Sequence, residues 1–302
     1  AARALNSARN CLLYVLLARR PDRLLLPAYL CDSMLEPLRR AAVEPAFYNV
    51  DADLEIAAEP ALGGSDCLLY VNYFGLKNDY CRRLAARYGP ALIVDDSQAF
   101  FAPPLACLAT LYSPRKFFGV ADGGYLYADA SLDTALERDV SYDSLRHLAG
   151  RVDLGASAFY AEFCASERRL GGRPLRRMSA LTEALLNGID YEHARRTRRR
   201  NFRHLHAALG AANRLRIDAD GIDGPMVYPF LSSDPALRQR LIARKVYVAT
   251  YWKEVLHSAQ ASAWEKELVE HLLPLPIDQR YGEAEMQFIV DLVGARAAPC
   301  PT

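Results

Sequence analysis

Short apolar runs, each closed by polar or turn-forming residues, recur along the first half of the chain. Runs of this length are typical of buried strands, and we expect them at 23–26, 46–50, 67–71, 91–94, 109–112 and 124–127. Segments with the pattern of helices lie between several of them, at 32–42, 78–88 and 131–139. Because strands that alternate with helices form parallel sheets covered on both faces, the pattern predicts an α/β fold with three layers and a mostly parallel sheet.

The pattern becomes helical after about residue 155. Long helical segments are expected at 156–169 and 178–209, with a break in the second near Asn187 and Gly188. Glycine and aspartate punctuate residues 210–225, and shorter elements follow: strands at 226–231 and 246–250, and helices at 234–243 and 283–295. We therefore predict a large domain at 1–190 and a smaller α+β C-terminal domain at 191–302.

Composition and charge argue against several classes of function. The 302 residues carry a formal net charge of +1, which favours neither nucleic acid nor an anionic membrane surface as a partner. No apolar stretch reaches the roughly 20 residues of a membrane span. The seven cysteines form no Cys-x-x-Cys pair and the six histidines show no metal-binding spacing, so no metal site is expected. We expect a cytoplasmic protein whose cysteines are mostly small core residues.

One cluster carries distinctive chemistry: Ser113-Pro114-Arg115-Lys116, followed by glycines at 119, 123 and 124. A lysine held in a pocket and partly desolvated can form an imine with an aldehyde. A serine hydroxyl three residues earlier can lie beside it and hold a phosphate, and glycines let the backbone approach a flat cofactor closely. Pyridoxal phosphate is the obvious aldehyde that also carries a phosphate, although Ser-x-x-Lys alone occurs in many surface loops.

A second cluster follows the strand expected at 91–94. Asp95 comes directly after this strand, and Gln98 lies three residues further on. The carboxyl edge of the sheet is where α/β folds bind ligands. A carboxylate there can keep a pyridinium nitrogen protonated, which makes the ring an electron sink, and an amide can bind the ring hydroxyl. The alternative for this segment is a polar turn that only closes the strand.

A third cluster lies near the start of the chain, before an apolar segment at 11–18 that is expected to form a buried helix. Ser7 or Asn6 is a suitable N-cap for that helix. Free N–H groups at a helix N-terminus bind phosphate, so Ser7, Ala8 and Arg9 are candidate phosphate ligands. The alternative is an ordinary helix cap.

Taken in order, these clusters resemble the DegT-type sugar aminotransferases, a family of fold type I pyridoxal-phosphate enzymes. The family's Ser-Gly-Thr before a helix is similar to residues 7–9, and its Glu-Asp-Ala-Ala-Gln turn is similar to residues 94–98. The family's serine, lysine and trailing Gly-Gly are similar to residues 113–124. The resemblance spans essentially the whole chain, because further similar segments lie at 27–31, 47–51, 71–75, 177–179, 191–200 and 275–277.

This resemblance implies fold type I architecture, pyridoxal 5'-phosphate as cofactor and transamination as reaction. Lys116 is the implied catalytic residue, which holds the cofactor and moves the proton. The resemblance also implies a homodimer, glutamate as amino donor and a nucleotide-linked keto sugar as acceptor, in surface polysaccharide or secondary-metabolite biosynthesis. The implied cofactor-binding residues are Lys116, Asp95, Gln98, Ser113, Ser7, Ala8, Arg9, Tyr29 and Cys31.

Several positions depart from the family pattern, among them Val94, which replaces a common glutamate, and the serine-to-lysine spacing, which is one or two residues shorter. Ala8 stands where the family usually has glycine, and Leu175 where it often has an asparagine that reaches the neighbouring subunit. Cys31 replaces an aromatic residue that stacks on the cofactor ring, a role that Tyr29 is then expected to take.

Two alternatives therefore stay open. One is another pyridoxal-phosphate enzyme, such as a lyase or a dehydratase, but Lys116 argues against the family's dehydratases because they carry histidine there. The other is a scaffold that binds cofactor or sugar without catalysis.

Two further features have plain structural interpretations. The arginine-rich run at 195–200 is expected to be one solvated helix face, whose side-chain stems cover apolar surface. Tyr251 and Trp252 are expected either to line the substrate mouth or to form a buried aromatic pair.

Overall fold

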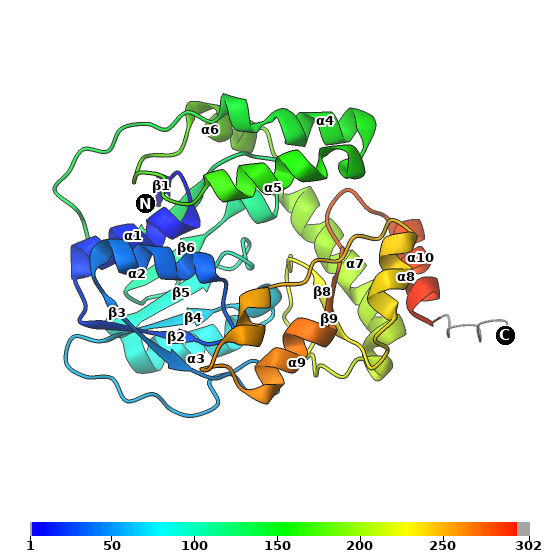
Figure 1. Cartoon of the computed structure of the whole chain (residues 1–302), viewed down its shortest axis with the longest axis horizontal. Coiled ribbons are helices and arrows are strands. Elements are labelled where there is room, and N and C mark those ends of the chain that lie inside the picture. The colour runs from blue at the N-terminus through cyan, green and yellow to red at the C-terminus, as the bar shows by residue number, and fades with distance from the viewer. Residues whose placement is uncertain (1, 295–302) are drawn as a thin grey trace.

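A seven-stranded sheet forms the centre of the computed structural model, which describes residues 2–294 (Figure 1). The strand order is β1-β7-β6-β5-β4-β2-β3. The strands are β1 (Arg3–Leu5), β2 (Arg23–Pro27), β3 (Glu44–Tyr48), β4 (Cys67–Val71), β5 (Leu92–Asp96), β6 (Ala109–Tyr112) and β7 (Gly124–Ala128). β6, β5, β4, β2 and β3 run parallel, whereas β7 is antiparallel to both β6 and β1.

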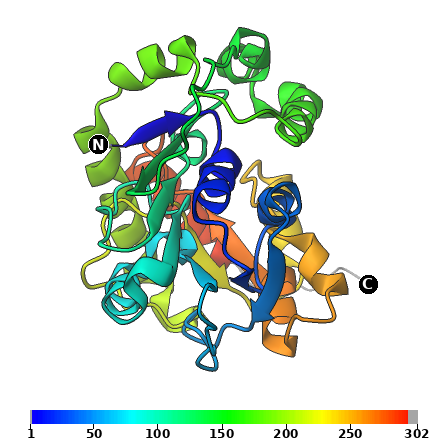
Figure 2. The same cartoon turned by 90° about the vertical axis from the view of Figure 1, so that its left-hand side faces the viewer.

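Helices cover both faces of this sheet. α1 (Ala8–Arg19) and α2 (Leu35–Ala41) lie on one side, and α3 (Asn78–Tyr88) lies on the other (Figure 2). Every residue of β4 and β5 is buried, as the uninterrupted apolar runs of a doubly covered parallel strand require. The predicted α/β fold with a mostly parallel sheet is therefore confirmed.

The start of α1 is capped by Ser7. Its hydroxyl oxygen accepts a hydrogen bond from the Asn10 N–H at 3.1 Å, which satisfies one of the amides that a helix leaves without an internal partner. Buried side chains from Asn10 to Leu16 then fix the helix against the sheet. Of the two caps that the sequence allowed, Ser7 is the one used.

Three helices stand beyond the β1 edge of the sheet: α4 (Arg146–Leu154), α5 (Tyr160–Arg169) and α6 (Ala180–Asn187). The predicted break near Gly188 is confirmed, because α7 (Tyr191–Leu209) starts a new helix. The Asp190 carboxylate accepts the His193 N–H at 2.8 Å and caps it.

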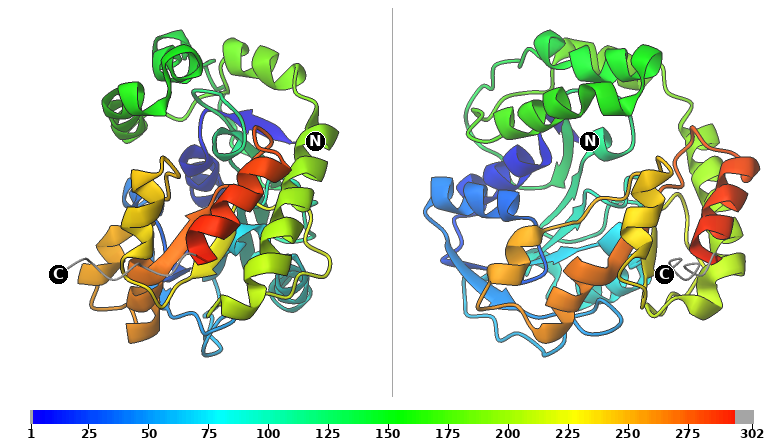
Figure 3. Two further views of the ribbon diagram at one scale, coloured as in Figure 1. Left: turned by 90° about the vertical axis from the view of Figure 1, so that its right-hand side faces the viewer. Right: turned by 45° about the vertical axis from the view of Figure 1, so that its right-hand side comes forward.

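A second group of elements follows α7. It contains β8 (Tyr228–Leu231), α8 (Leu237–Ala243), α9 (Ala263–His271), β9 (Leu272–Leu275) and α10 (Glu283–Gly294). β8 pairs antiparallel with β9, and α10 packs along α7 (Figure 3). A separate hydrophobic cluster around Phe202, Tyr228 and Leu273 holds these elements together. The boundary between 190 and 191 stays a prediction, and residues 295–302 lie outside the described part of the chain.

Two predicted elements are wrong. Residues 131–139 are not helical, because their end pairs as extended backbone with Arg177, whose N–H donates to the Glu137 carbonyl at 2.8 Å. Residues 246–250 form no strand, and the Arg238 guanidinium binds the Ala249 carbonyl at 2.8 Å. The sheet position beside β8 is taken instead by β9, for which no strand was predicted. Among the described helices, none is both long and apolar enough to cross a membrane.

Candidate active site

A cavity of about 730 Å³ opens at the carboxyl ends of β4, β5 and β6. Its wall combines this sheet edge, the N-terminus of α1, helices α4 and α5, and loops of the C-terminal half. Most of the residues that the sequence predicted for the site line it: Ser7, Ala8, Arg9, Cys31, Asp95, Gln98, Ser113 and Lys116. Residues from four separate chain segments thus meet at the sheet edge that the sequence pointed to.

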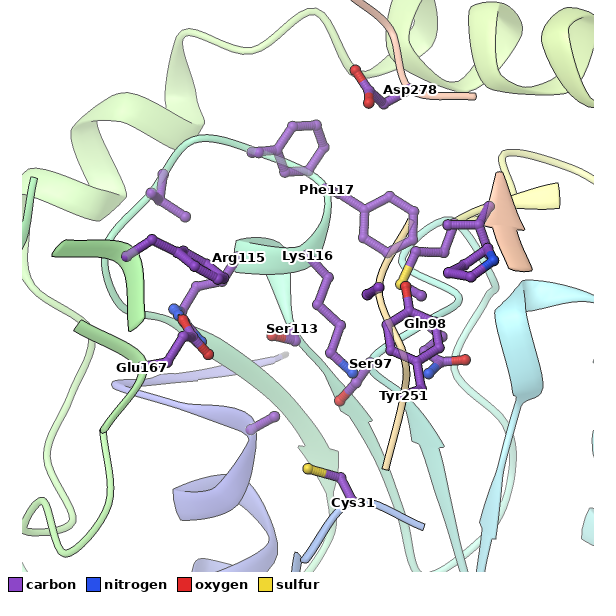
Figure 4. A pocket seen from close by; sticks show the side chains of 18 of the residues that line it. Cys31, Ser97, Gln98, Ser113, Arg115, Lys116, Phe117, Glu167, Tyr251 and Asp278 are labelled. Atoms are coloured by element: carbon purple, nitrogen blue, oxygen red, sulfur yellow. The ribbon is translucent and has the colours of Figure 1, made fainter. Parts of the chain in front are cut away.

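Lys116 follows β6 in a short 3-10 turn, Pro114–Lys116. Its side chain extends into the cavity and its ammonium points toward Ser97, beside Gln98 and Ser113 (Figure 4). The chain has five lysines, all of them described, and Lys116 alone lines this cavity. The cavity therefore holds a single primary amine that can react with a carbonyl compound.

Asp95 and Gln98 lie on the adjacent strand end. Asp95 is 5% exposed, and one of its carboxylate oxygens accepts the Ser97 N–H at 2.8 Å. The Gln98 carbonyl oxygen accepts the Phe74 N–H at 2.7 Å, which leaves its NH₂ group as the donor available to a ligand. Parallel pairing of β5 with β6 brings Asp95 opposite Leu111, two residues before Ser113. The carboxylate, the amide and the lysine turn therefore share one sheet edge.

Asp96, the next residue along β5, lies on the other face of the strand from Asp95. Because side chains alternate along a strand, it points away from the face that Asp95 occupies. It does not line the cavity, and the Asn72 amide donates to it at 2.8 Å. Burial, aided by the charge of the neighbouring Asp95 carboxylate and opposed by the Asn72 hydrogen bond, raises the pKa of Asp96 to about 8. Asp96 thus keeps its proton at neutral pH, while Asp95 is the carboxylate available to a ligand.

Ser7, Arg9 and Ser113 gather where α1 begins. This close assembly depends on Gly124, since a Cβ there would lie 2.6 Å from the Ser7 carbonyl carbon and 2.7 Å from the Ala8 nitrogen. The sequence had assigned the glycines to the approach of a cofactor, but Gly124 instead lets β7 pack on the start of α1. Of the three glycines, only Gly119 lines the cavity.

Tyr29 does not line the cavity, so the ring-stacking role expected for it has no direct support. It is 1% exposed and packs against Tyr73 at a ring distance of 5.6 Å and against Trp252 at 4.5 Å. Trp252 and Tyr251 do line the cavity, and Tyr251 also stacks on Phe74 at 6.3 Å. Tyr251 and Trp252 were expected either to line the substrate mouth or to form a buried pair. They do both, because they pack on the core and also face the cavity.

Arg198 is the main site feature that sequence reasoning missed. It belongs to the arginine run that was predicted to be one solvated face, yet it is 2% exposed. Its guanidinium donates to the Met226 carbonyl at 2.9 Å and to the Phe117 carbonyl at 3.4 Å, and lies 4.6 Å from the Phe117 ring centre. Burial lowers its pKa to about 10. Arg198 therefore anchors the lysine turn to the C-terminal half, whereas Arg199 and Arg200 are exposed as predicted.

Comparisons with solved structures agree with this architecture. A DegT DnrJ EryC1 StrS aminotransferase from Brucella abortus superposes with a TM-score of 0.65 and 17% identity, over 97% of this chain and 84% of that one. DesV of S. venezuelae, solved in complex with a ketimine intermediate, gives 0.64 and 17% over 97% and 83%. DesI, solved in the presence of its TDP-sugar product, gives 0.66 and 18% over 96% and 79%.

Sequence comparison adds nothing to this result. No family model matches the chain, and no curated protein matches it. The structural likeness nevertheless covers nearly the whole chain. This chain therefore has the fold of the DegT-type aminotransferases, the fold type I architecture that its sequence predicted.

Proposed function

We propose that this protein is a pyridoxal 5'-phosphate-dependent aminotransferase that acts on a keto sugar. The observation that carries the proposal is the meeting of one lysine amine, the Asp95 carboxylate and the Gln98 amide at a single sheet edge. The cofactor offers an aldehyde, a ring nitrogen, a ring hydroxyl and a phosphate, and the cavity holds a matching group for each of them. The residues present therefore fit the cofactor.

Each residue has a task that follows from its chemistry. The Lys116 amine would hold the aldehyde carbon and, once released, move a proton to or from the substrate carbon. The Asp95 carboxylate would hold a proton on the ring nitrogen, and the Gln98 NH₂ would donate to the ring oxygen. When bound, pyridoxal phosphate supplies an electron sink for the charge that develops at the substrate carbon.

The phosphate would lie at the start of α1. The Ser7 and Ser113 hydroxyls and the Arg9 guanidinium line the cavity there, and the helix N-terminus adds favourable N–H dipoles. One Nη of Arg9 donates to Glu36 at 3.5 Å, and its remaining N–H groups are available to a phosphate. Ala8, which replaces the family's usual glycine, is compatible with this site because it occupies the first position of a regular helix.

We propose a nucleotide-linked keto sugar as acceptor and glutamate as amino donor, for surface polysaccharide or secondary-metabolite biosynthesis. The Tyr251 and Trp252 side chains on the cavity wall support a sugar, because aromatic faces pack on the apolar face of a sugar ring. A TDP-sugar is the product present in the DesI structure, a protein of the same fold.

We also propose a homodimer that resides in the cytoplasm. The segment from 140 to 160 exposes large apolar side chains, among them Tyr142 at 73% and Val152 at 82%, which is typical of a surface that pairs with another chain. The cysteines from Cys11 to Cys164 are all free, which suits a reducing compartment. Light scattering after size-exclusion chromatography measures the mass directly, and a monomer at micromolar concentration would rule the dimer out.

An absorbance scan of the purified protein tests the enzyme class. The protein loaded with pyridoxal phosphate should show a band near 400 nm, as expected of a protonated imine, that borohydride abolishes and Lys116→Ala lacks. Lys253→Ala removes an exposed lysine outside the cavity and should keep the band. Added glutamate should bleach the band of an aminotransferase. A band that glutamate leaves unchanged would favour a scaffold instead.

A further inference from the structure

Two arginines line the cavity at a distance along the chain from the residues already discussed. Arg151 comes from α4, and Arg280 comes from the loop between β9 and α10. Asp278, which binds Arg280, lies at the end of the cavity opposite the Lys116 ammonium (Figure 4). The two side chains, called here the mouth arginines, thus approach the cavity from two separate parts of the molecule.

The mouth arginines have more N–H groups available to a ligand than Arg115 and Arg198, two other arginines that line the cavity. Arg115 is paired with Glu167, and Arg198 spends its donors on carbonyl oxygens and Gln279. Arg280 gives Nε and one Nη to Asp278, at 2.6 and 2.9 Å, and keeps its other Nη. Within residues 2–294, no carboxylate lies within 4.0 Å of Arg151.

Further positively charged side chains lie near the mouth arginines. Burial lowers the pKa of Arg151 and the positive charge of Arg280 lowers it further, while Tyr281 and the Asp278 carboxylate act in the opposite direction. Burial also lowers the pKa of His147; the Glu167 carboxylate raises it, and the charges of Arg115, Arg151 and Arg169 lower it. Among the residues that line the cavity, arginine and lysine outnumber aspartate and glutamate, which raises the local positive potential and attracts an anion from solution.

We propose that Arg151 and Arg280 bind the diphosphate that links a sugar to its nucleotide. The proposal rests on the proposed function, in which the sugar carbonyl must reach Lys116. A nucleotide-linked sugar whose carbonyl reaches Lys116 places its diphosphate toward the other end of the cavity, where the mouth arginines lie. Guanidinium groups bind phosphate oxygens through paired N–H donors, and two of them from different elements suit a group with two charged phosphorus centres.

The distal carboxylate of a dicarboxylic amino donor is the other anion that could bind here. It carries a single charge, and one guanidinium satisfies it by a bidentate pair. The site holds two guanidinium groups, Arg151 and Arg280, although they repel each other. A second guanidinium is of use to a diphosphate, which has two charged phosphate groups, and this favours the diphosphate.

Calorimetric titration of the purified protein with inorganic pyrophosphate tests the proposal. Arg151→Gln should weaken binding by on the order of tenfold to hundredfold, as expected for the loss of charge-assisted hydrogen bonds. Arg146→Gln is the matched control, because Arg146 lies on the same helix, is 80% exposed and does not line the cavity. Arg280→Gln should also weaken binding, and added salt should weaken binding to the wild type more than to Arg151→Gln.

Several results would overturn the proposal. The first is that the wild-type protein binds no pyrophosphate. The second is that Arg151→Gln and Arg146→Gln bind pyrophosphate with equal affinity. A parallel titration with glutarate, which has two carboxylates and no amine, separates the two anion sources. Loss of glutarate binding alone in Arg151→Gln would assign the mouth arginines to the amino donor. Failure of the proposed function gives a different signature: no absorbance band near 400 nm, whatever the anion affinity.

Discussion

Two consecutive carboxylates at the end of β5 have opposite environments. Asp95 faces the cavity and is fixed by the Ser97 N–H, whereas Asp96 faces the core and meets Asn72. Strand alternation creates the difference, and burial then raises the pKa of Asp96. The sequence predicted Asp95 as the ligand, because the strand end and the family resemblance both point to it, and the structure places Asp95 on the cavity wall. The sequence could not predict the raised pKa of Asp96, which depends on side chains that distant segments bring to it.

Replacement of Asp95 should damage catalysis without damaging the fold. Asp95→Asn keeps an oxygen for the Ser97 N–H but loses the negative charge proposed to hold the ring proton. We expect kcat with glutamate to fall by about a hundredfold to a thousandfold, as for other preorganised electrostatic contacts. Asp96→Asn is the control and should stay within a few-fold of wild type, because Asp96 is already neutral. Equal losses in both variants would contradict the assignment of Asp95.

The raised pKa of Asp96 predicts a pH dependence of stability. The folded protein holds a proton on Asp96 up to pH of about 8, whereas the unfolded chain releases it near pH 4. This contribution is fully present below pH 4 and is lost as the pH rises to 8, by up to about 1.4 kcal/mol per unit. Urea unfolding from pH 5 to 8 should therefore show a steeper decline for wild type than for Asp96→Asn. Parallel curves would show that Asp96 is ionised in the folded state.

At the scale of elements, the junction of β7 with α1 builds the phosphate end of the cavity. The chain passes from β1 into α1 beside Gly123 and Gly124, so that Ser7 and Ser113 lie on one wall. Gly124 has no room for a side chain, while a Cβ at Gly119 would meet nothing within 4 Å. The two glycines look equivalent in the sequence, yet only one of them is required by packing.

Gly124→Ala should separate the two elements. The added methyl would overlap the Ser7 and Ala8 backbone, and we expect a loss of about 1–3 kcal/mol in the free energy of unfolding, with weaker binding of pyridoxal phosphate. Gly119→Ala should change stability by less than about 0.5 kcal/mol. Urea unfolding and fluorescence titration with the cofactor measure both quantities. Similar stability losses in the two variants would refute the role of Gly124.

The elements that the sequence predicted are those whose environment is uniform along their length. Buried runs such as 67–71 and 109–112 become strands with those same limits, because both faces of each are covered. The failures at 131–139 and 246–250 have a different origin. Each is held by a partner outside the segment, Arg177 for the first and Arg238 for the second, and the pattern within the segment does not show these contacts.

At the scale of the whole molecule, a single buried arginine connects the sheet edge to the C-terminal half. Arg198 of α7 binds the Phe117 carbonyl, next to Lys116, and also the Met226 carbonyl before β8. The sequence could not reveal this role, since Arg198 lies in a run of arginines of which most are solvated. The place of Lys116, Asp95 and Gln98 in the cavity was predictable because each stands at a recognisable position beside a strand.

Arg198→Met should destabilise the protein by roughly 3 kcal/mol or more. The methionine keeps most of the apolar stem but removes the donor from the buried Pro225 and Met226 carbonyls, at about 1–3 kcal/mol each, while the Phe117 carbonyl keeps the Gln279 amide as a donor. Arg199→Met, on the exposed side of the same helix, should change the free energy of unfolding by less than about 0.5 kcal/mol. Urea unfolding compares the two. A loss below about 1 kcal/mol for Arg198→Met would show that the connection is dispensable.

The central claim is that Lys116 is the amine that captures pyridoxal phosphate. Borohydride reduction of the cofactor-loaded protein, followed by peptide mass mapping, tests this most directly, because only five lysines compete for the label. We predict a stoichiometric phosphopyridoxyl adduct on the peptide that contains Lys116, and none at Lys77, Lys245, Lys253 or Lys266. A label spread over several lysines, or absent from Lys116, would contradict the account.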